Sequence, residues 1–530
     1  MTSPGFNVAR FNSRRSPVLA RQGVIATAQP LASAAGLRML LDGGNAIDAA
    51  VAAAAVLGVT EPFQTGLGGD CFALIHDPRV GRVYALNASG PAPQAARLED
   101  YLGRGLTAMP EHGPLSWTVP GCVDGWCQML DRFGTMPLNV VLQPAIGYAR
   151  DGYAVSPSDA TQWQLSEASL AKHPSTRRHL LINGRAPRTG EIMVQSTLAD
   201  TLAILAEGGR DAFYIGPIAD QLVLFSERSG GLLSHTDLAQ YRAEWQSPIG
   251  LDYCSHRILE CPPNGQGIAA LLALKSVAHV DFTEHARDSA ACWHLMIEAI
   301  KHGMTMSANH VADPRFASLD VETLLCAAPR LQLPGSASMP HANPPRGSDT
   351  VFIAVVDAAG NAVSFINSVY GDFGSIWMAD DLGFVIQNRG WGFSLDPSHP
   401  NRLQPGKRPF HTIIPGMALR EGKPSHVFGI TGGFMQPQGH LQLVISLLNY
   451  AMDAQTAIDF PRFWWQGDRL VVAEDGLPDA TYAMLANWGH EVERRDGRRG
   501  FGGAQIIAIQ PDGVCIAGSE PRQDGCAIGF

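Results

Sequence analysis

"RGSDTVFIAVVDAAGNAVSFINS" (Arg346–Ser368) contains two apolar runs separated by a short connection. The first run begins at Thr350 and is apolar at nearly every position, which is typical of a strand covered on both faces. The connection contains Gly360 and is only a few residues long, so it predicts a β-hairpin. A buried strand is therefore expected to begin at a threonine about two thirds of the way along the chain.

The segment in front of this hairpin has a different composition. "PRLQLPGSASMPHANPPRGSD" contains five prolines among Gly, Ser and Asn, and residues 328–349 therefore read as a linker or mobile loop. A flexible segment that ends where a buried strand begins suits a chain that is cut between Asp349 and Thr350. The cut would give Thr350 a free α-amino group, which titrates near ~7.7–8 and could activate the threonine's own hydroxyl. An ordinary transition from loop to strand is the alternative interpretation.

Further helices and strands are expected on both sides of the hairpin. "SAAGLRMLLDGG" (33–44) and "NAIDAAVAAAAVLG" (45–58) predict two helices, the region 98–310 reads as mostly helical, and "AQIIAIQPDG" (504–513) predicts a strand. Strand pairs that are covered on both faces and flanked by helices indicate a layered α/β sandwich.

Composition excludes several classes of function. The 530 residues carry a formal charge of −10 without a cluster of basic residues, which argues against nucleic acid as a partner. The nine cysteines form no C-x-x-C pair, so reduced thiols are expected rather than disulfides or a metal site. The N-terminal residues contain no apolar run typical of a signal peptide, and the longest apolar run is too short to span a bilayer. We therefore expect a cytoplasmic protein that does not bind membranes.

Three blocks of the sequence resemble the γ-glutamyltransferase family, and they occur in that family's order. The blocks are "GGNAIDAAVAAAAVLGVTEPFQTGLGGDCF" (43–72), "DTVFIAVVDAAGNAVSFINSVYGDFGS" (349–375), and "ITGGFMQPQGHLQ" (430–442) with the closing "GSEPRQDGCAIGF" (518–530). The resemblance implies an N-terminal nucleophile hydrolase with a four-layer αββα sandwich. It also implies self-cleavage into a large chain, 1–349, which would end in the flexible tail 328–349, and a small chain, 350–530.

The catalytic residues of the family can be placed on this sequence. Its nucleophilic threonine corresponds to Thr350, and a second threonine that assists processing corresponds to Ser368. The backbone N–H groups of the oxyanion hole were matched to Met435 and Gln436. Nucleophile, base and oxyanion hole would all come from the chain, so the resemblance implies no metal and no organic cofactor.

The residues with which the family grips an α-amino acid are replaced. The positions matched to that grip are occupied here by Ala88, Tyr370, Arg389, Gly392, His411 and Thr412. Arg389 would repel an ammonium group, whereas a guanidinium suits a carboxylate, which it binds through two parallel hydrogen bonds. The resemblance therefore implies that the catalytic residues are kept and that the recognition of a γ-glutamyl group is lost.

Segment 393–407 is short compared with the lid of many transferases. A trimmed lid would open the site to water and favour hydrolysis, although a simple loop deletion explains the length equally well.

The motifs "NRGWGFSLDP" (388–397), "GKRPFHTIIP" (406–415) and "MQPQGHLQ" (435–442) resemble a cytosolic branch of the family that includes oxamate amidohydrolase, an enzyme of purine (allantoin) catabolism. We therefore expect hydrolysis of a small anionic amide such as oxamate to oxalate and ammonia. Arg389, His411, Thr412 and Tyr370 would bind the substrate.

Three alternatives remain open at this point: a γ-glutamyl hydrolase or transferase acting on glutathione-type substrates, an enzyme like the glutaryl and cephalosporin acylases, and an unprocessed relative that only binds a ligand. The expected partners are the large and small chains of one precursor, which would form a heterodimer. The resemblance also permits two such heterodimers to pair.

Overall fold

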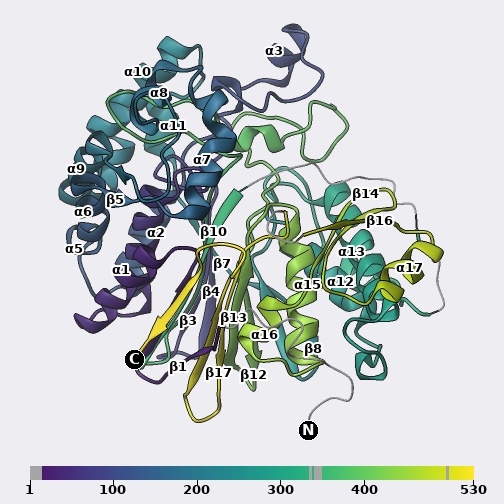
Figure 1. The fold of residues 1–530 in the computed structure, drawn as a ribbon. Coiled ribbons are helices and arrows are strands. Elements are labelled where there is room, and N and C mark those ends of the chain that lie inside the picture. Colours follow the sequence, from purple (N-terminus) through teal and green to yellow (C-terminus); the bar gives the residue numbers. More distant parts are fainter. Residues whose placement is uncertain (1–14, 334–336, 339–348, 497–499) are drawn as a thin grey trace.

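Two seven-stranded sheets face each other in the centre of the molecule, and helices cover the outer face of each (Figure 1). The computed structural model describes residues 15–333, 337–338, 349–496 and 500–530. The first sheet has the order β19-β2-β10-β11-β3-β4-β7. Its strands are β2 (Gly23–Thr27), β3 (Asp70–Asp77), β4 (Arg82–Ala88), β7 (Glu244–Gln246), β10 (Asp349–Asp357), β11 (Ala362–Tyr370) and β19 (Cys526–Gly529).

The second sheet has the order β1-β18-β17-β13-β12-β9-β8. Its strands are β1 (Val18–Ala20), β8 (Ile249–Tyr253), β9 (His256–Glu260), β12 (Gly416–Arg420), β13 (Lys423–Ile430), β17 (Ala504–Ile509) and β18 (Cys515–Ser519). Buried apolar side chains of both sheets, including Phe72, Phe352 and Val427, form one cluster between them. The two sheets are therefore held together by a shared core.

Helices on the first sheet form one outer layer, seen on the left of Figure 1. α1 (Pro30–Leu41), α2 (Ala46–Thr60) and α4 (Cys122–Phe133) pack against its strands. α2 begins with a capping box between Asn45 and Asp48, and its alanines let it approach the sheet closely. Further out lie α3 (Leu98–Gly103), η2 (Pro114–Ser116), α5 (Leu138–Val141), α6 (Gln143–Asp151), α7 (Pro157–Leu170), α8 (Pro174–Leu180), α9 (Ser196–Tyr214), α10 (Pro217–Ser229), α11 (His235–Gln240) and the pair β5 (Tyr153–Ala154) and β6 (Ile192–Met193).

The second sheet is covered by the other outer layer. α12 (Gly267–Val277) and α15 (Met435–Leu448) pack on its strands, and α13 (Ala290–His310) packs on these helices. The layer is completed by η3 (Phe282–Glu284), α14 (Val321–Cys326), α16 (Ala454–Asp459), β14 (Phe463–Gly467), β15 (Leu470–Glu474), α17 (Asp479–Asn487) and β16 (Glu491–Arg495). Of the helices in the described residues, none combines the length and the apolar character needed to cross a membrane.

The predicted hairpin is confirmed, because β10 and β11 pair in antiparallel register with Val355 opposite Val363. Val351 and Ile353 face the core under the first helical layer, whereas Phe352 faces the core between the sheets. Both faces of β10 are thus covered, as the nearly continuous apolar run predicts.

The expectation that 98–310 is mostly helical holds except at 244–260. Residues 244–260 form β7, β8 and β9, which extend both sheets at their edges. The turn between β8 and β9 uses Cys254 and Ser255 at φ +47° and +60°. Hairpin turns of this kind usually carry Asn or Gly, so the sequence offered no turn signal there.

Most of the proposed tail 328–349 lies outside the described residues. The described part is hydrogen-bonded: Leu331 N–H donates to the Ser276 carbonyl at 3.0 Å, and Ala337 N–H donates to the Trp488 carbonyl at 2.7 Å.

Candidate active site

Thr350 lies at the start of β10 in the middle of the first sheet, where its side chain is fully buried. The pairing of β10 with β11 shifts between Asp349 and Val351, so Thr350 sits at an irregularity of the ladder. Its hydroxyl donates to Ser368 Oγ on β11 at 3.3 Å. The structure therefore brings together the two hydroxyls that the sequence nominated.

Arg389 belongs to η4 (Arg389–Gly392), and its guanidinium lies beside these hydroxyls. It donates from Nη1 to Thr412 Oγ1 at 2.8 Å and from Nη2 to Ser368 Oγ at 3.3 Å. Its central carbon is 3.9 Å from the centre of the Tyr370 ring, a cation–π contact. Tyr370 also donates its N–H to Ser368 Oγ at 2.9 Å. Four of the predicted residues thus surround Thr350.

The Arg389 guanidinium is completely buried, and within the described part of the chain it forms no ion pair with a carboxylate. Its Nε atom is buried without a hydrogen-bond partner among those same residues. Burial lowers the pKa of Arg389 to about 10, so the group remains a cation at neutral pH. A buried cation without a paired anion is costly, and it can be compensated by a bound anion.

Asp70, at the start of β3, is a site residue that the sequence reasoning missed. Its Oδ1 accepts hydrogen bonds from the N–H groups of Gly90 and Gly121 at 3.0 and 3.1 Å and from Gln387 Nε2 at 2.9 Å. Burial raises the pKa of Asp70 to about 7, although the nearby Arg389 opposes this effect. The sequence signal that could have identified Asp70 is an acid between a run of glycines and a buried strand, as in "GLGGDC".

His411 is held by Asp70 rather than pointing freely at the nucleophile. His411 Nε2 lies 3.0 Å from Asp70 Oδ2, and Nδ1 accepts the N–H of Ile413 at 3.4 Å. Burial, followed by the charges of Arg389 and Arg408, lowers the pKa of His411 well below its ordinary value, so the ring is neutral. Both ring nitrogens are engaged, which gives His411 a supporting position behind Thr412.

The oxyanion donors that the sequence placed on Met435 and Gln436 need correction. The N–H of Met435 donates to the Gly432 carbonyl at 2.9 Å, and that of Gln436 donates to the Gly433 carbonyl at 3.1 Å, because both groups belong to the first turn of α15. Those donors are therefore already used. The N–H groups of Gly432 and Gly433 form no hydrogen bond with another residue of the described chain.

Gln436 contributes through its side chain instead. Its Oε1 accepts the N–H of Ile414 at 2.8 Å, which fixes the amide with its nitrogen towards Thr350. Nε2 donates to Thr350 Oγ1 at 3.4 Å. Met435 is buried in the apolar cluster under the second helical layer and has no polar contact with the site.

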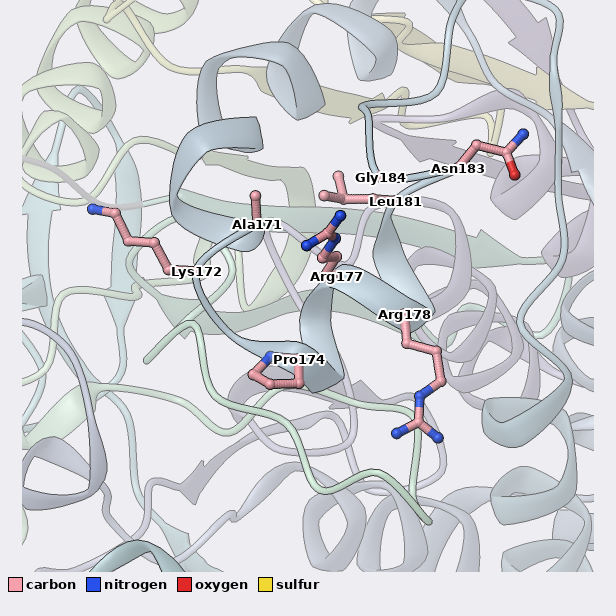
Figure 2. A pocket seen from close by; sticks show the side chains of 8 residues that line it. All are labelled: Ala171, Lys172, Pro174, Arg177, Arg178, Leu181, Asn183 and Gly184. Atoms are coloured by element: carbon pink, nitrogen blue, oxygen red, sulfur yellow. The ribbon is translucent and has the colours of Figure 1, made fainter.

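A hollow of about 530 Å³ on the helical side of the molecule offers no nucleophile (Figure 2). It is lined by Ala171, Lys172, Pro174, Arg177, Arg178, Leu181, Asn183 and Gly184. Arg178 turns away from the hollow and pairs with Asp380 at 2.9 Å. None of the lining residues is Ser, Thr or Cys, so we do not place covalent chemistry there.

One cluster among the described residues has the composition of a metal site: His294, Glu298 and His490. Its groups already satisfy one another, because His294 Nδ1 lies 2.8 Å from His490 Nε2 and Lys301 Nζ lies 2.9 Å from Glu298 Oε1. The ammonium of Lys301 supplies the positive charge that a metal ion would bring.

Comparisons with known proteins agree with this arrangement. The sequence profile described as Gamma-glutamyltranspeptidase matches residues 32–530. The "Glutathione hydrolase-like YwrD proenzyme" of Bacillus subtilis is 38% identical over 97% of this chain and 99% of that protein. The "Oxamate amidohydrolase proenzyme" of Klebsiella pneumoniae is 36% identical over 96% and 98%.

Among solved structures, the crystal structure of cephalosporin acylase from Bacillus halodurans superposes with a TM-score of 0.93 at 40% identity, covering 98% of each chain. The agreement confirms the αββα sandwich of an N-terminal nucleophile hydrolase, and with it an enzyme that hydrolyses amide bonds. The chain therefore belongs to the gamma-glutamyltranspeptidase family.

Proposed function

We propose that the chain cuts itself between Asp349 and Thr350 and then hydrolyses an amide whose acyl part carries a carboxylate close to the carbonyl. The observation that carries this proposal is the buried guanidinium of Arg389, which lies beside the Thr350–Ser368 hydroxyl pair without a carboxylate partner in the described chain. Arg binds a carboxylate through two parallel hydrogen bonds, so a bound substrate anion would both compensate the charge and orient the amide.

The reaction would use Thr350 as nucleophile and base together. After the cut, the α-amino group of Thr350 takes the hydroxyl proton, and Oγ1 attacks the amide carbonyl. The amine leaves with a proton, and a water molecule then hydrolyses the ester on Thr350 to release the acid. In the first, internal reaction the same Oγ1 attacks the carbonyl of Asp349, and Ser368 and Gln436 are placed to hold it. The Asp349–Thr350 C–N bond then breaks, the hydroxyl proton passes to the released α-amino group, and water hydrolyses the ester left on Oγ1.

The oxyanion of the tetrahedral intermediate needs donors that are not already engaged. The N–H groups of Gly432 and Gly433 meet this condition among the described residues. Their φ angles of +98° and +56° lie in the left-handed region that favours glycine. We therefore assign them as oxyanion donors, in place of Met435 and Gln436. The loss of one such donor typically costs ~3–4 kcal/mol of transition-state stabilisation.

Oxamate is the substrate that fits the Arg389 end of the site best. Its carboxylate adjoins the scissile carbonyl, and it lacks the α-amino group that Arg389 would repel. Ammonia and oxalate would be the products. The Tyr370 ring and the Thr412 hydroxyl, which already contact Arg389, would then lie beside the bound carboxylate.

Hydrolysis of a larger, substituted amide is the second candidate, and a specific observation favours it. A cavity of about 710 Å³ adjoins Gly432, far more room than the ammonia released from oxamate requires. Segment 393–407 does not cover the site as a long lid; it folds back on itself through bonds between Ser394, Asn401 and Leu403.

A panel of amides decides between these substrates. Purified protein is first run on a denaturing gel, where two bands are expected in place of one. Release of amine is then measured for oxamate, an N-alkyl oxamate, a glutaryl amide and a γ-glutamyl anilide. Preference for the oxamates supports the proposal, and preference for the γ-glutamyl anilide would overturn it.

A further inference from the structure

The cavity beside Gly432 is lined by the turn after α2 and by the turn before α15. One wall is the turn after α2, where the carbonyl of Gln64 accepts the N–H of Val369, the residue next to Ser368, at 3.0 Å. The opposite wall contains Thr431 and Gly432. A group that enters this cavity therefore lies on the side of the oxyanion turn, away from the guanidinium of Arg389.

The cavity wall is rich in hydrogen-bond acceptors that have no donor. Glu61 Oε2, Gln64 Oε1, Asp159 Oδ2 and Gln523 Oε1 are all buried without a partner in the described chain. Glu61, Gln64 and Asp159 are only 2%, 6% and 3% exposed. Unpaired buried acceptors are rare in folded proteins, because each carries a desolvation cost that a ligand with several donors can relieve.

Acidic side chains also outnumber basic side chains around the cavity. Glu61, Asp159, Asp372 and Asp524 line it, together with Arg15 and Arg522. Arg522 is already neutralised by Glu474 at 2.6 Å and Glu520 at 2.8 Å. Arg15 donates to the Gly525 carbonyl at 2.8 Å. Asp524 accepts a hydrogen bond from Ser156 Oγ at 2.5 Å, whereas no ion pair is formed by Glu61 or Asp159 within the described chain.

We propose that this cavity binds an ammonium group on the amine portion of the amide substrate, with Glu61 and Asp159 as its counter-ions. An alkylammonium supplies three N–H donors and one positive charge, which are what the wall lacks. The substrate would then be an amide with a negative acyl end on Arg389 and a positive leaving group in the cavity. This inference rests on the proposed function for its chemistry, but the cavity and its acceptors stand independently of it.

Two observations support this assignment. Burial, followed by the charge of Asp159, raises the pKa of Glu61 well above its ordinary value, and burial with Asp524 raises the pKa of Asp159 to about 7. Both shifts are expected of carboxylates without a cation. In addition, one carboxylate oxygen of each residue, Glu61 Oε2 and Asp159 Oδ2, has no hydrogen-bond partner in the described chain, so the fold does not use either carboxylate fully.

Binding can be measured without any enzymatic turnover. Calorimetric titration of the full-length chain with propane-1,3-diamine is compared with titration of the neutral propane-1,3-diol. The diamine is expected to bind and the diol is not. Glu61→Gln and Asp159→Asn should each weaken the affinity for the diamine about tenfold or more. Asp220 is an exposed acid on α10, and Asp220→Asn should leave this affinity unchanged. Absence of diamine binding, or equal binding by all variants, overturns the proposal.

Turnover provides the second arm. N-(3-aminopropyl)oxamate and N-butyloxamate share the acyl group and differ only in the terminal cation. The wild-type kcat/KM should favour the aminopropyl amide about tenfold or more, and Glu61→Gln with Asp159→Asn should abolish that preference while N-butyloxamate is cleaved as before. If neither amide is cleaved but the diamine still binds through Glu61 and Asp159, the oxalyl specificity fails and the ammonium site stands. If both are cleaved equally and the diamine does not bind, the site fails and the amidohydrolase stands.

Discussion

The hydroxyl oxygens of Thr350 and Ser368 lie 3.3 Å apart on two neighbouring strands in the middle of a sheet. Both residues belong to paired strands, at the point where the register of β10 and β11 shifts, so this distance is set by the sheet and not by a flexible loop. Ser368 Oγ also accepts a hydrogen bond from Arg389 Nη2 at 3.3 Å, so the Ser368 hydroxyl connects Thr350 to the buried cation. Changes at either position should therefore affect both self-cleavage and turnover.

Replacement of Thr350 tests the nucleophile. Thr350→Ala removes the attacking oxygen, so the protein should run as one uncut band and show no amidase activity. Thr350→Ser keeps the hydroxyl and should still be cut, which shows that the site folds. A cut and active alanine variant would contradict the assignment.

Replacement of Ser368 tests the relay of hydroxyls. Ser368→Ala removes the partner of Thr350 Oγ1, and one hydrogen bond is worth about 1 kcal/mol, so cleavage should slow about fivefold to tenfold. Ser368→Thr keeps the hydroxyl and should be cut at close to the original rate. The appearance of the two chains over time on a gel measures the effect, and equal rates for both variants would remove Ser368 from this role.

Replacement of Arg389 tests the recognition of a carboxylate. Arg389→Ala should reduce kcat/KM for an anionic amide at least ~30-fold, since loss of one partner of a buried charge pair costs ~2–5 kcal/mol. Arg389→Lys keeps the charge but not the paired hydrogen bonds, so it should recover only part of the activity. A neutral amide is the control substrate, and a loss of the same size for both amides would point to misfolding instead.

Gln436 offers a nearly isosteric test of the side-chain amide. Gln436→Glu keeps the oxygen that accepts the Ile414 N–H but removes the N–H donor that faces Thr350 Oγ1 at 3.4 Å. We expect slower acylation and also a lower melting temperature, because the new carboxyl group is completely buried. Single-turnover kinetics separates acylation from hydrolysis of the acyl-enzyme, and an unaltered acylation rate would show that the contact is incidental.

Asp70 should make stability depend on pH in the direction opposite to an ordinary carboxylate. Its folded-state pKa of about 7 lies above that of the unfolded chain, so the folded protein binds more protons between pH 4 and 7. Stability is then highest at the acidic end of this range and falls as the pH rises to 7. A tenfold difference in proton affinity corresponds to about 1.4 kcal/mol.

Asp70→Asn removes this dependence while it keeps an oxygen for the N–H groups of Gly90 and Gly121. Denaturant unfolding at pH 5 and pH 8 measures the effect. The free energy of unfolding of the variant, relative to that of the wild type, should be higher at pH 8 than at pH 5. Parallel stabilities at both pH values would show that Asp70 is ionised throughout.

The central hairpin could be predicted from sequence because both faces of β10 are buried and its apolar run is continuous. The strands at 244–260 could not, because they lie at sheet edges, are partly exposed and turn through Cys254 and Ser255. Thr350, Ser368, Arg389 and Thr412 came from matched motifs and do lie together. Asp70 and the side chain of Gln436 were missed, because their contacts join segments that are far apart in the sequence.

The oxyanion donors that we propose differ by a few residues from those expected from the sequence, for a related reason. Sequence identifies the turn before α15 but not which of its N–H groups the helix already uses. That distinction depends on where α15 starts, and helix starts are among the least certain features of a sequence.

The order of strands in the two sheets has a consequence for how the two parts of the protein are synthesised and assembled. In the first sheet β2, which precedes the proposed cut, lies between β19 and β10, and β11 lies next to β3; in the second sheet the later strands β18, β17, β13 and β12 lie together between β1 and β9. Two polypeptides made separately would have to intercalate strand by strand to reach this arrangement. A single translated chain avoids that search and supplies both parts in equal numbers, so the proposed cut would follow the assembly of both sheets.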